Sequence, residues 1–276
     1  MEKYRIVASD LDGTLLNNQS QISRENMEAI EKLAGMGAYF VPSSGRTLSE
    51  MPTEIKNSPA VRYIIHSNGA VVFDKQAGPL SLTCLPNSTV RAIMDVLTDY
   101  EANVTVRHNG QSIVDASCQS AQDFAYYNVI EAHQHCVRNY SVHVDNFAEH
   151  VYNADNVEVF SAFFHSYEEK LECRARLEKI EKLRIVEASE YNLEIMNVDA
   201  GKGNALYALA DLLGIDRKAT ISLGDSDNDT SIIKAAGLGL AVSNSCDILK
   251  AAADRIICSN EEHAIAYVVS NYFSDP

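Results

Sequence analysis

The chain has no apolar run of membrane-spanning length, no Cys-x-x-Cys pair and too few basic residues to balance its acidic ones. A membrane-crossing helix needs about 18 or more consecutive apolar residues, and the residues after Met1 lead straight into a strand-like segment without the apolar stretch of a signal peptide. The six cysteines lie far apart, which favours reduced thiols over a disulfide framework. We therefore expect a cytoplasmic protein with no membrane partner.

The shortage of positive charge also narrows the choice of partners. The sequence has 23 Lys and Arg residues against 38 Asp and Glu residues, which gives a net charge of −15. This charge repels the nucleic-acid backbone, so we expect no nucleic-acid partner. An anionic substrate would need local positive groups, which a metal ion, a lysine and helix N-termini can supply.

What the 276 residues do contain is a β/α alternation that is interrupted once. In residues 1–82, strand-like runs such as Tyr63–His66 alternate with helical segments, including one expected over residues 48–56. The alternation resumes over residues 191–276, and strands separated by helices pair in parallel. We predict an α/β fold, with a Rossmann-like, doubly wound parallel sheet core (1–82 and 191–276) and an inserted α+β domain (83–190).

The segment Asp10-Leu11-Asp12-Gly13-Thr14 directly follows the first apolar strand. Residues i and i+2 of a strand share a face, so carboxylates at this spacing can converge on one point just beyond the strand. Gly13 lets the backbone leave sharply. An isolated Asp-Gly would indicate only a turn, whereas this pair of carboxylates suits a divalent cation and an attacking carboxylate.

Three further polar groups follow predicted strands or open a helix. Ser43-Ser44-Gly45-Arg46 follows the second strand, residues 224–229 (Gly-Asp-Ser-Asp-Asn-Asp) follow a later one, and Lys202 begins a helix. Free amides at a helix start attract anions, and parallel sheets bind ligands at the carboxyl ends of their strands. We therefore expect these groups to meet Asp10 at one edge of the sheet.

These four motifs occur along the chain in the order Asp10, Ser44, Lys202 and Asp225 and are spread over the whole core. In this respect the chain resembles the haloacid dehalogenase (HAD) superfamily, and within it the Cof-type branch with a large inserted C2B cap. The resemblance implies a nucleophile at Asp10 and a general acid/base at Asp12. It implies phosphate-binding groups at Ser44, Gly45, Lys202 and Asn228, Mg²⁺ ligands at Asp10, Asp12 (through its backbone carbonyl), Asp225 and Asp229, and weaker substrate contacts at Arg46 and Asn68.

The chemistry of that family explains these residue types. Mg²⁺ lowers the repulsion between a phosphate monoester and an anionic nucleophile. Asp10 is expected to attack phosphorus and form an aspartyl-phosphate, and Asp12 to protonate the leaving alcohol and then activate water. The resemblance thus implies a Mg²⁺-dependent phosphatase. A cap that closes over the site favours small soluble phosphorylated metabolites, such as sugar phosphates, nucleotides or phosphorylated cofactors.

Two other functions remain open at this point. One is a phosphomutase of the phosphomannomutase type, and the other is a non-enzymatic phosphate sensor or aspartate-phosphorylated switch. A switch needs a long-lived acyl-phosphate, whereas a carboxylate at Asp12 promotes its breakdown, so Asp12 favours turnover. Neither the substrate nor the oligomeric state follows from the sequence.

The predicted cap also contains several potential metal ligands close together, namely His133, His135, Cys136, His143 and His150. Zinc sites use such residues, but their spacing matches no metal-ligand pattern. We expect a solvated or partly buried face, with a zinc site as the alternative.

Overall fold

The computed structural model describes residues 4–273, which form two compact units. The first, here called the core, comprises residues 4–45, 51–81 and 201–273. The second, here called the cap, comprises Leu82–Ala200 together with the short segment Arg46–Glu50.

The core consists of strands and helices from both ends of the chain. Its strands are β1 (Ile6–Ser9), β2 (Tyr39–Pro42), β3 (Tyr63–His66), β4 (Val71–Asp74), β5 (Gly78–Leu82, whose last residue begins the cap), β12 (Thr220–Gly224), β13 (Leu238–Ala241) and β14 (Arg255–Ile256). Its helices are α1 (Arg24–Gly35), α2 (Thr53–Asn57), α8 (Lys202–Leu213), α9 (Thr230–Ala235), α10 (Asp247–Ala252) and α11 (Ala264–Tyr272).

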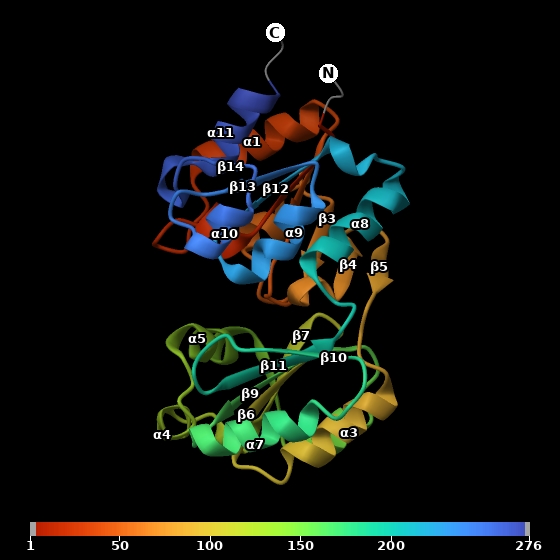
Figure 1. Ribbon diagram of the computed structural model, residues 1–276, viewed down its shortest axis with the longest axis vertical. Coiled ribbons are helices and arrows are strands. Elements are labelled where there is room, and N and C mark those ends of the chain that lie inside the picture. The colour runs from red at the N-terminus through yellow and green to blue at the C-terminus, as the bar shows by residue number, and fades with distance from the viewer. Residues whose placement is uncertain (1–3, 274–276) are drawn as a thin grey trace. The chain divides into compact units, whose positions relative to one another are not determined.

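The core strands form a parallel sheet with helices on both faces (Figure 1). The order is β14-β13-β12-β1-β2, all parallel, and a bridge between Ser43 and Ile65 connects β2 to an antiparallel β3-β4-β5 meander. Strands β1 and β12 are buried throughout, as expected for a sheet covered on both sides. The predicted doubly wound parallel core is confirmed. The chain winds outward from β1 in one direction and from β12 in the other, so the topological switch point lies between these two strands.

The cap is built around a six-stranded sheet in the order β10-β11-β9-β6-β7-β8. All pairs are antiparallel except β7 with β8. The strands are β6 (Ala102–His108), β7 (Gln111–Asp115), β8 (Ser141–Val144), β9 (Val157–Phe164), β10 (Leu183–Val186) and β11 (Asn192–Asn197). The helices are α3 (Asn87–Leu97), α4 (Ala121–Tyr126), α5 (Glu131–Tyr140), α6 (Phe147–Tyr152) and α7 (Tyr167–Leu177).

Two sequence-based boundaries differ from the structure. Residues 191–200 were expected in the core, but β11 pairs with β9 and β10, and its Leu193 and Ile195 lie in the apolar interior of the cap. The helix expected over residues 48–56 is wrong in its first half. Only Thr53–Asn57 is helical, because Arg46–Glu50 forms turns that hydrogen-bond to cap residues instead of continuing a core helix.

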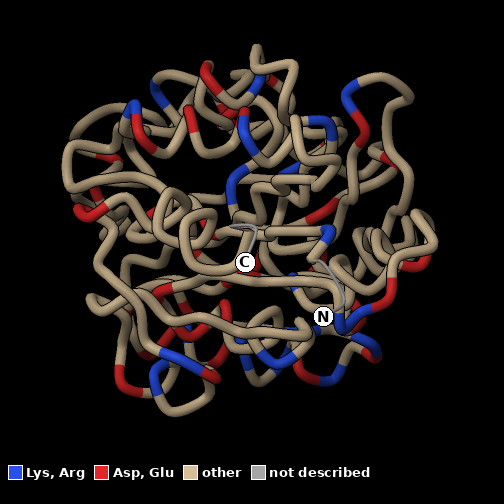
Figure 2. Tube along the Cα trace, turned by 90° about the horizontal axis from the view of Figure 1, so that it is seen from above, with Lys and Arg blue, Asp and Glu red and all other residues tan. Residues whose placement is uncertain are grey.

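Charged residues of both signs are interspersed along the chain (Figure 2). Within residues 4–273, no helix combines the length and the apolar composition that crossing a bilayer requires.

Candidate active site

The site is built on the ends of two neighbouring core strands. The Asp10 N–H, just beyond β1, donates to the Leu223 carbonyl of β12 at 3.0 Å, which fixes the two strand ends side by side. Asp225 follows β12, and Asp229 closes the short turn after it. Because both strands end at the topological switch point, side chains far apart in the sequence meet there.

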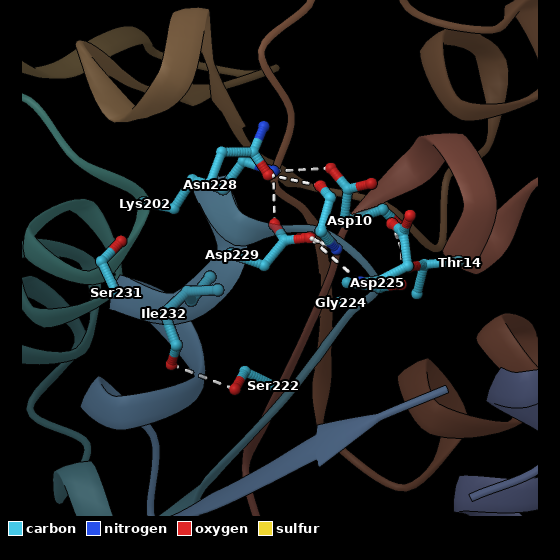
Figure 3. A network of polar contacts seen from close by, with 12 residues as sticks. Asp10, Thr14, Lys202, Ser222, Gly224, Asp225, Asn228, Asp229, Ser231 and Ile232 are labelled. Carbon is cyan, nitrogen blue, oxygen red and sulfur yellow. Dashed lines mark hydrogen bonds and ion pairs between the residues drawn. The ribbon is translucent and has the colours of Figure 1, made fainter. Parts of the chain in front are cut away.

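Lys202 joins two of these acidic side chains (Figure 3). Its ammonium Nζ lies 2.6 Å from Asp10 Oδ1 and 2.6 Å from Asp229 Oδ1. All three side chains are buried. A buried ammonium with two carboxylate partners is well compensated, so Lys202 holds both carboxylates in fixed positions.

Three carboxylates form a cluster that suits a metal ion. One oxygen each of Asp10, Asp225 and Asp229 lies within 4.8 Å of the others. Asp229 Oδ2 accepts from the Asp225 N–H at 3.1 Å, and Asp225 Oδ1 accepts from the Thr14 hydroxyl at 3.0 Å. Hard divalent cations such as Mg²⁺ prefer carboxylate oxygens, so this donor set fits such a cation.

Gly13 makes room for that cluster. Its φ is +76°, a region that favours glycine, and an added Cβ would lie 2.6 Å from Asp225 Oδ2. Any side chain at this position would therefore push Asp225 away.

Burial sets the protonation of the cluster. It raises the pKa of Asp10 well above its usual value; Lys202 opposes this, and Asp229 and Asp225 add to it. Burial and the neighbouring Asp229 raise the pKa of Asp225 to about 6. For Lys202, burial alone would lower the pKa, but the two carboxylates outweigh burial and raise it. The ammonium therefore stays charged at neutral pH, and a divalent cation would favour the ionised carboxylates.

Asp12 lies apart from the buried cluster. It is exposed, on the irregular turn η1 (Leu11–Leu15), with extended backbone angles (φ −72°, ψ 121°). Its charge still acts on Asp225. Solvent therefore reaches the Asp12 carboxylate, two residues along the chain from the buried Asp10.

A second loop ends beside the first. The Ser43 N–H donates to the Ser9 carbonyl at 2.8 Å, which brings Ser44 next to the end of β1. The Asn68 N–H donates to the Ser44 carbonyl at 3.1 Å, and a Cβ on Gly45 would lie 2.9 Å from Asn68 Oδ1. Ser44, Gly45 and Asn68 therefore form one tightly packed loop pair at the carboxyl end of β2.

Two further predicted site residues each have a local hydrogen-bond partner. Arg46 belongs to the cap, and its Nη1 donates to the Glu50 carbonyl at 3.2 Å. Asn228 is exposed, and its Oδ1 accepts from the Ser226 hydroxyl at 2.8 Å.

Two supporting residues had no role assigned from the sequence. The Thr14 hydroxyl orients Asp225, as described above, and Asn244 Nδ2 donates to the Gly13 carbonyl at 2.8 Å. Asn244 Oδ1 in turn accepts from the Asn260 N–H at 3.0 Å. The role of Thr14 could have been predicted from its place in the first motif. The contact between Asn244 and Gly13 could not, because it depends on tertiary structure.

Within residues 4–273, no three His or Cys side chains of the cap come close enough together to share an ion. Among the described residues, the acidic cluster at Asp10 is the only group of three or more His, Cys, Asp or Glu side chains close enough to hold an ion. The half-buried His133 packs against Phe163, with Nε2 2.9 Å from the Thr105 hydroxyl, and His150 packs against His108. The structure therefore disfavours the zinc alternative.

Comparison with known proteins identifies the family. A family model of haloacid dehalogenase-like hydrolases matches residues 7–269. The chain belongs to this family. It is 29% identical to the phosphatase YwpJ of Bacillus subtilis, over 97% of this chain and 99% of that protein. It is also 29% identical to the 5-amino-6-(5-phospho-D-ribitylamino)uracil phosphatase YitU of Bacillus subtilis, over 99% of this chain and 98% of that protein.

The fold agrees with this assignment. A HAD subclass IIB sugar phosphatase superposes with a TM-score of 0.78 at 20% identity, covering 98% of this chain and 99% of that one. The resemblance read from the four motifs is thus confirmed at the level of family and fold.

Proposed function

We propose that this HAD-family phosphatase hydrolyses small soluble phosphomonoesters in a Mg²⁺-dependent reaction that passes through an aspartyl-phosphate on Asp10. One observation carries the proposal. The carboxylates of Asp10, Asp225 and Asp229 lie within 4.8 Å of one another, and Lys202 bridges two of them. A site that bound only a cation would not need a buried ammonium beside the carboxylate ligands. A site that also binds phosphate uses such a positive group to stabilise the phosphate oxygens.

The acidic cluster provides the nucleophile and the cation ligands. Asp10, Asp225 and Asp229, with the Asp12 carbonyl, would hold Mg²⁺, which when bound offsets the repulsion between carboxylate and phosphate. Asp10 attacks phosphorus in line, and the leaving alcohol departs with a proton from Asp12. Asp12 then takes a proton from the water that cleaves the acyl-phosphate, which restores Asp10.

The remaining site residues bind the transferring group. Lys202 and the Ser44 hydroxyl stabilise the negative charge on the phosphoryl oxygens, with the Gly45 backbone beside them and Asn228 in the loop after β12. Arg46 and Asn68 remain candidate substrate contacts. Of these two, Asn68 has the stronger support, because it packs directly on Gly45.

The substrate class follows from relatives and not from this site. YitU is named for a phosphorylated ribityl compound that carries a uracil ring, so we propose that polyol and sugar phosphates are among the substrates of this chain. The cytoplasmic location expected from the sequence remains a prediction.

A panel of phosphomonoesters tests the proposal, assayed with Mg²⁺ and with EDTA. We expect phosphate release that requires Mg²⁺ and that Asp10→Asn abolishes. Asp12→Asn should slow turnover strongly and let the phosphorylated enzyme accumulate. The matched control is Asp227→Asn, an exposed acid in the same loop as Asp225 but outside the cluster, and it should keep activity within about twofold.

Two outcomes would contradict the proposal. Release that is insensitive to EDTA would exclude the role of the metal. A stable phosphoryl group on Asp10 of the unaltered enzyme, with no phosphate release from any ester, would favour the mutase or the switch.

A further inference from the structure

The irregular turn η1, which carries Asp12, contains a residue of high backbone freedom. Gly13 directly follows Asp12, has a φ of +76°, and leaves no room for a side chain beside Asp225. Glycine allows a wider range of backbone angles than any other residue, so rotation at Gly13 can redirect the exposed carboxylate before it. A contact that fixes the Gly13 peptide therefore also limits the orientations open to Asp12.

Asn244 makes such a contact. Its Nδ2 donates to the Gly13 carbonyl at 2.8 Å, and its Oδ1 accepts from the Asn260 N–H at 3.0 Å. Because a backbone N–H can only donate, the amide oxygen of Asn244 must face Asn260 and the amide nitrogen must face Gly13. The side chain is thus oriented from both ends, although Asn244 is exposed.

Asn260 holds the same turn at its other end. This residue is buried, and its Nδ2 donates to the Leu16 carbonyl at 3.0 Å. The Leu16 N–H in turn donates to the Leu11 carbonyl at 2.8 Å, which closes the turn. Asn244 and Asn260, linked to each other, therefore hold η1 at its middle and at its end.

The loop that carries Asn244 is itself anchored beside the acidic cluster. The Ser245 hydroxyl donates to the Gly224 carbonyl at 3.1 Å, and the Cys246 N–H donates to the Asp225 carbonyl at 2.9 Å. Asn244 therefore connects the backbone next to Asp225 with the turn η1. All of these residues belong to the core, so the arrangement is complete within that unit.

We propose that Asn244 is a positioning residue for Asp12. By donating to the Gly13 carbonyl, it keeps η1 in the conformation in which the Asp12 carboxyl gives its proton to the leaving alcohol. This proposal rests on the proposed function. In that reaction the bond between Asp10 and phosphorus forms, the ester P–O bond breaks, and the proton of Asp12 moves to the departing oxygen. Asn244 exchanges no proton and acts only through the turn.

A positioning role of this kind predicts a dependence on the leaving group. The alcohol of an alkyl ester such as ribitol 5-phosphate needs a proton as it departs, whereas acetate leaves acetyl phosphate as a stable anion without one. The ratio kcat/KM reports the steps up to this departure. Misalignment of Asp12 therefore lowers kcat/KM for the alkyl ester more than for acetyl phosphate, whereas a general loss of structure lowers both alike.

Variants of Asn244 test the proposal with acetyl phosphate and the fastest alkyl ester of the panel. Asn244→Ala should lower kcat/KM for the alkyl ester by about 10- to 30-fold and for acetyl phosphate by no more than about threefold. Asn244→Asp keeps the shape of the side chain and the acceptor for Asn260 but loses the donor to Gly13, so it should change the ratio of the two values as much. The matched control is Asn271→Ala. Asn271 is also exposed, and its Nδ2 also donates to a backbone carbonyl, that of Tyr267, at 2.8 Å, so neither rate should change.

A double variant tests whether Asn244 acts through Asp12. In Asp12→Asn the proton donor is absent, so adding Asn244→Ala should lower kcat/KM for the alkyl ester by less than about twofold more. Fully additive losses would overturn the proposal, as would Asn244 variants that slow both esters equally. If the unaltered enzyme hydrolyses no alkyl ester, the proposed function itself fails; if it hydrolyses one and the variants show no dependence on the leaving group, only the role of Asn244 fails.

Discussion

Each unit contains a buried cation, Lys202 in the core and, in addition to the buried Lys170, Arg107 in the cap, and Lys202 and Arg107 are satisfied to different degrees. In the core, Lys202 contacts two carboxylates at 2.6 Å each. In the cap, Arg107 makes one contact to Glu194 at 3.4 Å and keeps two nitrogens without a partner. Both side chains are almost completely buried. Lys202 and Arg107 therefore do not differ in burial. They differ in how many of their N–H groups have a hydrogen-bond partner.

The two cations therefore differ in how firmly the protein holds them. A fully compensated cation such as Lys202 holds its neighbours in place before any ligand arrives, which is what transition-state stabilisation requires. A partly compensated cation such as Arg107 keeps buried donors without partners, which costs free energy of folding. The predictions below test the core side of this comparison.

The largest effect on stability and activity is expected from replacing Lys202. Lys202→Met leaves two buried carboxylates facing each other, so we expect a loss of stability of about 3–5 kcal/mol at pH 7.5 and a loss of kcat of at least about 100-fold. The loss of stability should shrink toward pH 5, because protonation of the carboxylates removes their repulsion. Urea unfolding at both pH values and steady-state kinetics measure these effects.

The control for this change is Lys234→Met, since Lys234 is an exposed lysine on α9. It should leave both quantities close to those of the unaltered protein. A Lys202→Met protein that unfolds at the same urea concentration as the control would contradict the contrast between the two cations.

A smaller effect is expected from crowding the core cluster. Gly13→Ala places a Cβ 2.6 Å from Asp225 Oδ2 and at a φ of +76°, so Asp225 must move. We expect kcat/KM to fall by about 10- to 100-fold. Gly37→Ala is the matched control: Gly37 has nearly the same φ, +73°, but open space around its Cβ position. Both variants should lose about 1–2 kcal/mol from backbone strain, and only Gly13→Ala should lose activity.

Sequence patterns predicted the core site better than the cap. Asp10, Asp225 and Lys202 each follow or open an element whose pattern is unambiguous, and the rule that ligands bind at the ends of parallel strands brings them together. Family and fold are confirmed, whereas the catalytic roles of these residues remain proposals. The contact between Lys202 and Asp229 could not be predicted, because it depends on how α8 and α9 pack.

The sequence was less informative where local pattern and tertiary structure disagree. Residues 48–50 have a helical composition, yet Glu50 bonds to Ser112 more than sixty residues away. Strand β11 follows the cap helices and precedes the core helix α8, so the pattern alone does not say which sheet it joins. The burial of Arg107 could not be predicted, because the sequence does not distinguish a buried arginine in a strand from a solvated one.

The smallest expected effect is a pH dependence of the stabilisation by Mg²⁺, set by Asp225. The pKa of Asp225 is raised to about 6, so without a cation the folded protein holds this proton more tightly than the unfolded chain, and the contribution of Asp225 to stability falls as pH rises from about 4 to 6. Mg²⁺ bound at the cluster, as proposed, would compete with that proton. We therefore expect the rise in Tm on adding Mg²⁺ to be large at pH 7.5 and to decline as pH falls through about 6.

Thr14→Val sharpens this prediction. The Thr14 hydroxyl donates to Asp225 Oδ1 at 3.0 Å and lowers the pKa of Asp225. Its removal should move the midpoint of the Mg²⁺ effect upward by about one pH unit. The control, Thr230→Val, removes a hydroxyl that bonds to Asp227 in the same loop and should leave the midpoint unchanged. If Thr230→Val moved the midpoint as far as Thr14→Val does, the shift would not come from the hydrogen bond to Asp225, because the Thr230 hydroxyl bonds to Asp227 instead.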